Sequence, residues 1–187
     1  MRNKKVYIMS FCGIAIAVNI ILGIVTSALK LPIYLDTLGT VVTAVLFGPL
    51  PGAIVGALTN IITGFIYSIR DIPFLLVNVA VALIVGFAAK KFKFTLITAL
   101  ICGLILSVVC PLIGTPIGIF IYGGLTGTVS DILVMALKNS GSSIFAASFI
   151  AKIGNNLLDK VGTCILAYFL IKSLPASIKS SVNYASK

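Results

Sequence analysis

Long apolar segments dominate the sequence and limit what the chain can fold into. No charged side chain interrupts the first of them, from Val6 to Leu29. About 20 predominantly apolar residues in a helix cross the hydrocarbon core of a bilayer. Over the whole chain 59% of residues are hydrophobic, 10% are charged, and the mean hydropathy is +1.20, whereas a soluble domain carries about 25% charged residues. The sequence therefore predicts an all-α integral membrane protein.

The apolar segments predict about six transmembrane helices in a single domain covering residues 1–187. Pro- and Gly-rich or charged turns separate them, among them the turn Gly48–Gly52. Between residues 110 and 143, Pro111, Pro116 and several glycines predict broken structure, which at membrane depth persists only when it is buried in protein or lines a cavity. The expected spans are Val6–Leu29, Thr37–Phe47, Ala53–Ile69, Phe74–Ala89, Phe94–Val109 and a last helix that begins between Ser143 and Asn156 and ends near Lys172.

The basic residues predict the orientation of these spans. The formal net charge is +10, but the Lys and Arg side chains lie between apolar runs, which argues for membrane topology and against nucleic-acid binding. With an even number of spans, one side holds nine of the 14 basic residues, so both termini, residues 1–5 and 176–187, are expected in the cytoplasm of a multi-pass plasma-membrane protein. The nine are Arg2, Lys4, Lys5, Lys90, Lys91, Lys93, Lys172, Lys179 and Lys187.

The sequence has few side chains suited to catalysis or metal binding. The chain has no His, its four acidic residues are all Asp, and none of its four cysteines forms a C-x-x-C pair. A metal site, a cofactor and general acid–base catalysis are therefore not expected. The cysteines are interpreted as packing residues of apolar helices.

A polar stripe on the last helix is the strongest candidate for a site. Residues 152, 155, 156, 159, 160 and 163 fall on one face of a helix. A Lys or Asp at mid-membrane costs about 2.5–3.5 kcal/mol on insertion scales, so such side chains pair with each other or face a cavity. Three interpretations stay open: a structural polar seam, a helix start that lies above the membrane, or the wall of a ligand pocket that contains Asn156, Asp159 and Lys160.

Two further features are candidates for the same pocket. The Gly-rich segment from Tyr122 to Asp131 allows close backbone approach to a ligand, and Thr126 and Asp131 add polar groups. Its alternative is a surface turn. Asn78 is an isolated polar residue in an apolar helix, where it bonds a neighbouring helix or faces the cavity.

Small residues at helical spacing predict close helix contacts. The third span carries Gly52, Gly56 and Gly64, for which packing within the chain is the preferred interpretation. The first span carries Gly13 and Ala17, for which a partner protein is the other option.

The order of several short motifs resembles the S components of energy-coupling factor (ECF) transporters. The resemblance covers nearly the whole chain. Its motifs are Leu35–Thr40, Leu46–Pro49, Gly52 with Gly56, Tyr122–Gly127 with Asp131, and Asp159-Lys160 leading to Ala167–Pro175.

The resemblance implies a six-helix subunit that captures a vitamin or a related heterocyclic micronutrient outside the cell. It implies a transmembrane coupling subunit, contacted through small residues that match Gly13 and Ala17, and two cytoplasmic ATPases. It also implies a pocket gated by the loop Lys30–Asp36, which carries Tyr34. The chain lacks Trp, and the aromatic side chains left to stack a ligand are Tyr34, Tyr67, Tyr122 and Phe120.

Three functional alternatives remain from the sequence. The chain is a substrate-binding subunit, a polytopic sensor module without a transport role, or a membrane enzyme. The missing acid–base residues disfavour the last. The sequence does not select one substrate among riboflavin, folate, pantothenate, pyridoxine and queuosine-precursor bases.

Overall fold

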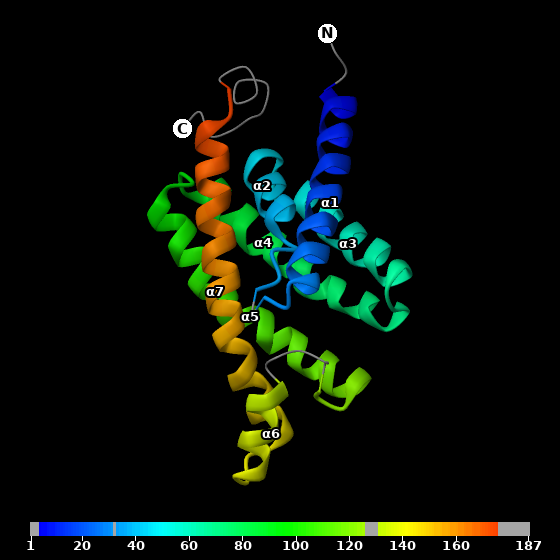
Figure 1. Ribbon diagram of the computed structural model, residues 1–187. Helices are drawn as coiled ribbons and strands as arrows, with labels where there is room; N and C mark the ends of the chain where they lie inside the picture. Colours follow the sequence, from blue (N-terminus) through cyan, green and yellow to red (C-terminus); the bar gives the residue numbers. More distant parts are fainter. Residues whose placement is uncertain (1–3, 32, 126–130, 176–187) are drawn as a thin grey trace.

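The computed structural model describes residues 4–31, 33–125 and 131–175, and within these ranges the chain is helical, without a strand (Figure 1). The tails and Thr126, which the sequence analysis singled out, lie outside or partly outside the described residues. The elements are α1 (Lys4–Ala28), α2 (Leu38–Phe47), α3 (Pro49–Ile66), the 3-10 helix η1 (Ile69–Phe74), α4 (Leu75–Lys91), α5 (Leu96–Tyr122), α6 (Asp131–Asn139) and α7 (Ile144–Ser173).

Four of the described helical segments are long and apolar enough to cross a membrane: α1, α3, η1 with α4, and α5. The helix α2 is apolar but has only 10 residues. The helix α7 has 30 residues, which is ample length, but its polar stripe lowers its hydropathy. The predicted class, an all-α membrane protein, is confirmed, whereas the count of six spans rests on how α2 and α7 are placed.

The junction between α2 and α3 is a single residue. Gly48 has φ +101° and ψ 174°, a conformation that suits glycine and allows the chain to reverse there. The helix α3 then begins at Pro49, since a proline in the first turn removes no helical hydrogen bond. The predicted turn Gly48–Gly52 was therefore too long, because Pro49, Pro51 and Gly52 already belong to the helix.

The helix α5 is one continuous element. The sequence analysis ended it near Val109 and expected broken structure after it, and that prediction was wrong. Pro111 and Pro116 both lie inside the 27-residue helix, which shows that packing on neighbouring helices outweighs the local cost of proline. The helix ends only at Gly123, a left-handed cap with φ +68°.

The glycines of the third span pack within the chain. A Cβ added at Gly52 would lie 2.6 Å from the Ala44 side chain of α2, and one at Gly56 would lie 2.8 Å from Asn78 Oδ1 of α4. These close approaches support intramolecular packing of this stripe, the preferred interpretation from the sequence.

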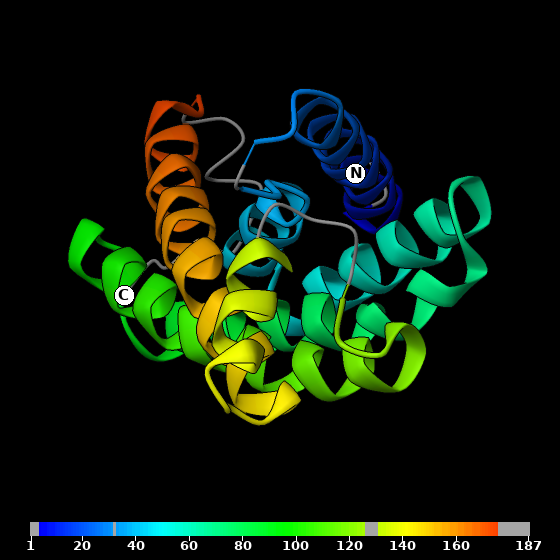
Figure 2. The same ribbon diagram turned by 60° about the horizontal axis from the view of Figure 1, so that its bottom comes forward.

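The helices surround a core between α2, α4, α5 and α7, which includes Val41, Val85, Leu106, Cys164 and Ile171. The helix α1 begins and α7 ends at the top of Figure 1, while α6 packs against the start of α7 at the bottom. Figure 2, turned to bring this bottom forward, shows the described part of the segment before α2 between α7 and α1. The two ends of the bundle are thus different: one carries the junctions at Gly48 and at residues 92–95, and the other carries η1, α6 and the segment 33–37.

Candidate functional site

A cavity of about 540 Å³ lies at the end of the bundle that carries η1 and the segment 33–37. Its walls come from the later parts of α1, α3 and α5 and from the earlier parts of α4 and α7. All of these are the helix ends that meet on this side. The volume falls within the range of about 300–1,000 Å³ that is typical of small-molecule pockets.

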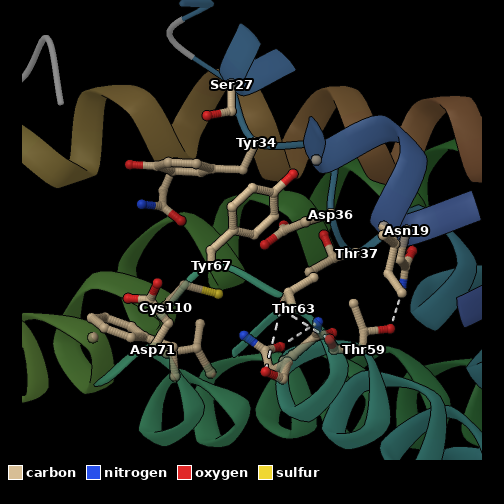
Figure 3. Close-up of a pocket in the computed structure, with 18 of the residues that line it drawn as sticks. Asn19, Ser27, Tyr34, Asp36, Thr37, Thr59, Thr63, Tyr67, Asp71 and Cys110 are labelled. Atoms are coloured by element: carbon tan, nitrogen blue, oxygen red, sulfur yellow. Dashed lines mark hydrogen bonds between the residues drawn. The ribbon is translucent and has the colours of Figure 1, made fainter. Parts of the chain in front are cut away.

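The lining of this cavity mixes neutral polar and aromatic side chains with a few charges. Figure 3 shows Tyr34 and Tyr67 extending into it, with Asp36, Thr63 and Asp71 around them. Such a surface offers hydrogen-bond donors and acceptors, aromatic faces and charges of both signs to a small molecule. The polar and aromatic lining residues are Asn19, Ser27, Tyr34, Asp36, Thr37, Thr59, Asn60, Thr63, Tyr67, Asp71, Phe74, Asn78, Tyr122, Lys152, Asn156 and Lys160.

Five of the eight residues that the sequence suggested for ligand binding line this cavity: Tyr34, Asn78, Tyr122, Asn156 and Lys160. Asp131 begins α6 and Asp159 is buried behind the 33–37 segment, so neither is a lining residue. Thr126 lies outside the described residues. Phe120, named as a stacking candidate, is 93% exposed and is also absent from the lining.

A buried ion pair joins α7 to the loop after α1. Asp159 and Lys160 are 0% and 3% exposed, and Lys160 Nζ is bonded to Asp159 Oδ2. The same ammonium donates to Thr37 Oγ1 at 3.1 Å and lies 3.8 Å from Asp36 Oδ1. Because a charge in an apolar helix needs partners, these contacts explain how α7 tolerates two adjacent charges.

The backbone of the loop is held at the same place. Asp159 Oδ1 accepts hydrogen bonds from the N–H groups of Tyr34 and Leu35 at 2.9 and 2.8 Å. Thr26 Oγ1 of α1 donates to the Tyr34 carbonyl at 2.8 Å. Burial raises the pKa of the Tyr34 phenol, so this group remains a neutral donor at physiological pH.

Asn19 is a buried polar residue that the sequence analysis did not single out. Its Nδ2 donates to Thr40 Oγ1 at 2.9 Å and to Thr59 Oγ1 at 3.1 Å, and its Oδ1 accepts from the N–H of Gly39 at 2.6 Å. It therefore ties α1 to α2 and α3 at the floor of the cavity. Only the isolated polar character of Asn19 within an apolar span signalled such a role.

Two further contacts order the wall opposite the 33–37 segment. Asn78 Nδ2 donates to Asn60 Oδ1 at 2.9 Å, which joins α4 to α3. The Tyr122 hydroxyl donates to Asp71 Oδ1 at 2.7 Å, which joins the end of α5 to η1. Asn78 was expected either to bond a neighbouring helix or to face the cavity, and its contacts combine both.

The first helix, α1, contributes to the cavity, which the spacing of its small residues did not suggest. Gly23 and Ser27, two small residues in the later part of α1, line the cavity. Gly13 and Ala17 lie nearer the other end of α1 and are exposed. Nothing in the described structure lies within 4 Å of a Cβ added at Gly13, so this part of the helix has no intramolecular packing partner at that point.

A bundle of apolar helices of membrane-spanning length around a cavity of hydrogen-bonding, aromatic and charged groups is the architecture of a membrane-embedded small-molecule-binding protein. No group of three or more potential metal ligands occurs among the described residues. The chain belongs to the family of S components of ECF-type riboflavin transporters, whose sequence profile matches residues 3–175. Comparison with curated proteins and with solved structures gave no match. The family confirms the resemblance stated above, and its members are substrate-binding transporter subunits and not enzymes.

Proposed function

We propose that the chain binds riboflavin outside the cell as the substrate-specific subunit of an ATP-driven importer. The observation that carries this proposal is the polar and aromatic cavity at one end of the bundle, in a chain that the riboflavin-type family matches over residues 3–175. Another neutral heterocyclic micronutrient is the nearest alternative, since it would use the same kind of surface.

The chemistry of riboflavin suits the lining. Its isoalloxazine ring is flat and aromatic, which favours contact with rings such as those of Tyr34, Tyr67 and Phe74. Its carbonyl and imide edge and its ribityl hydroxyls need donors and acceptors, and the amides and hydroxyls around the cavity supply both. A buried polar group without a partner costs about 1–3 kcal/mol, so ligand and lining would satisfy each other.

Riboflavin titration of the detergent-purified protein tests this proposal. Riboflavin fluorescence should be quenched in a saturable manner as the ring enters the cavity, with one molecule bound per chain. Mass spectrometry of material released from the purified protein should find a flavin. Release of a different heterocycle, with no response to riboflavin, would overturn the assigned substrate but leave the binding role in place.

We also propose six membrane spans, formed by α1 to α5 and α7. On this proposal α6 lies outside the membrane, and both termini of the chain lie in the cytoplasm. On this arrangement Lys90, Lys91 and Lys93 face the cytoplasm, as the positive-inside rule requires, and the cavity opens to the outside. An opening of the cavity to the outside distinguishes an importer subunit from a receptor for a cytoplasmic ligand.

Labelling of single cysteines checks the orientation. In a background without the four native cysteines, Ser140→Cys beside α6 should react with an impermeant thiol reagent in whole cells, while Lys93→Cys should react only after the membrane is opened. Both residues are exposed, so accessibility within the fold does not limit either reaction. Labelling of Lys93→Cys in intact cells would reverse the proposed topology.

The partner proposed for the exposed part of α1 is the transmembrane coupling subunit, and through it two cytoplasmic ATPases. Gly13→Leu and Ala17→Leu should reduce co-purification with this subunit at least about tenfold, because added bulk prevents close helix approach. Riboflavin binding by the isolated chain should stay unchanged, since both positions lie away from the cavity lining. Normal assembly of both variants would exclude this interface, and failure of the parent chain to capture ATPases would favour the sensor alternative.

A further inference from the structure

The carboxylate of Asp159 has no free face toward the cavity. Its side chain is fully buried, Oδ1 accepts two backbone N–H groups of the loop, and Oδ2 is bonded to Lys160. The cavity lining includes Lys160 and Tyr34 but not Asp159. The two adjacent charges of α7 therefore have different positions relative to a ligand, and Asp159 faces the loop.

We propose that Asp159 is a positioning residue that binds no ligand and acts through Tyr34, whose place in the cavity wall it fixes. This inference rests on the proposed function, because it concerns the same cavity. Asp159 is the acceptor that holds the N–H groups of Tyr34 and Leu35, and it orients the Lys160 ammonium toward Thr37.

The backbone of the loop supports this role. Leu35 has φ +50°, the left-handed conformation, which is unfavourable for a side chain of this size. Such a conformation persists where surrounding contacts determine it, and here the N–H of Leu35 points at Asp159 Oδ1 at 2.8 Å. Without the carboxylate, the N–H of Leu35 loses its hydrogen-bond acceptor. Tyr34, one residue earlier, then loses its fixed position.

The charges around Asp159 support a carboxylate that interacts with the loop and with Lys160 and not with a ligand. Lys160 is its partner on α7, and Asp36 of the loop lies 3.8 Å from the same ammonium. Lys160 thus bridges two carboxylates: that of Asp159, behind the loop, and that of Asp36, which lines the cavity. A ligand acceptor can reach Lys160 from the cavity side without displacing Asp159.

A double-mutant cycle with riboflavin as the probe separates positioning from direct contact. Asp159→Ala and Tyr34→Ala should each weaken binding about tenfold or more, but Tyr34→Ala should add less than about twofold in the Asp159→Ala background. Asp159→Asn, which keeps an oxygen acceptor for the loop, should restore much of the affinity. Asp71→Asn is the matched control: its carboxylate lines the same cavity and bonds Tyr122, so its effect should multiply with that of Tyr34→Ala. Multiplying effects of Asp159→Ala and Tyr34→Ala would overturn the proposal.

A ligand-free readout keeps this inference separate from the substrate assignment. In a background without native cysteines, Ile33→Cys should react faster with a thiol reagent when Asp159→Ala is present than with Asp159→Asn or the parent. If Asp159→Ala does not fold, the pair Asp159→Ala with Lys160→Met removes both charges and should show the same faster labelling. Equal labelling rates in these variants would overturn the positioning role, whereas absence of riboflavin binding by the parent would overturn only the proposed substrate.

Discussion

Gly39→Ala is expected to destabilise the protein more than any other single-methyl change on α1 to α3. The added Cβ would lie 2.2 Å from the Ala15 carbonyl oxygen and 2.8 Å from its carbonyl carbon. These are backbone atoms of α1, so they yield only if the helix moves. Such a movement would also stretch the 2.6 Å bond from Gly39 N–H to Asn19 Oδ1. Overpacking of this kind costs about 3 kcal/mol.

Thermal unfolding followed by circular dichroism measures this effect. A loss of about 3 kcal/mol lowers the Tm of a chain of this size by about 10 °C. Gly13→Ala is the matched control, because a Cβ there meets nothing within 4 Å. The control should keep the parent Tm and riboflavin affinity. Equal Tm values for the two variants would show that α1 and α2 are not packed as described.

Lys160→Ala should cause the largest loss of ligand binding together with a loss of stability. The ammonium lines the cavity and is the charged partner of the buried Asp159 carboxylate. Removing one member of a buried ion pair costs about 3–5 kcal/mol, and losing a charged hydrogen bond to the ligand weakens affinity about tenfold or more. Both the Tm and the riboflavin affinity should therefore fall.

Asn156→Ala separates these two effects. Asn156 lines the cavity one turn before Lys160, and its Nδ2 donates only to the Lys152 carbonyl within α7 among the hydrogen bonds of the described residues. Its replacement should weaken riboflavin binding about tenfold with a nearly unchanged Tm. If Lys160→Ala and Asn156→Ala lower the Tm but leave the affinity of the folded molecules intact, the stripe on α7 is a structural seam.

Much of the fold was predictable because apolar runs set the helices. The boundaries of α1, α2 and α4 differ from the predicted spans by two residues or fewer at each end. The continuity of α5 was not predictable from Pro111 and Pro116, because local rules treat proline as a helix breaker, and only the packing of α5 on α4 and α7 outweighs them.

The candidate site was predictable where a polar side chain was conspicuous within its own helix. The stripe on α7 was found because charges in an apolar helix are costly. The sequence did not separate the neighbours Asp159 and Lys160, since which of them faces the cavity depends on the path of a loop more than 120 residues earlier, as the bond from Tyr34 to Asp159 shows. The role of Asn19 was missed for a similar reason, because Thr40 and Thr59 reach it only after three helices have packed together.

The shortness of α2 bears on how far a substrate has to travel. Its 10 residues rise by about 15 Å, half of a hydrocarbon core of about 30 Å. Thr37, the residue before α2, lines the cavity, Gly39 in the first turn bonds Asn19 at the cavity floor, and α2 ends at Phe47, before Gly48 on the proposed cytoplasmic side. On the proposed topology, a molecule bound at this floor lies about 15 Å, the length of α2, from the cytoplasmic end of that helix, so import on that proposal leaves about half of a hydrocarbon core still to cross.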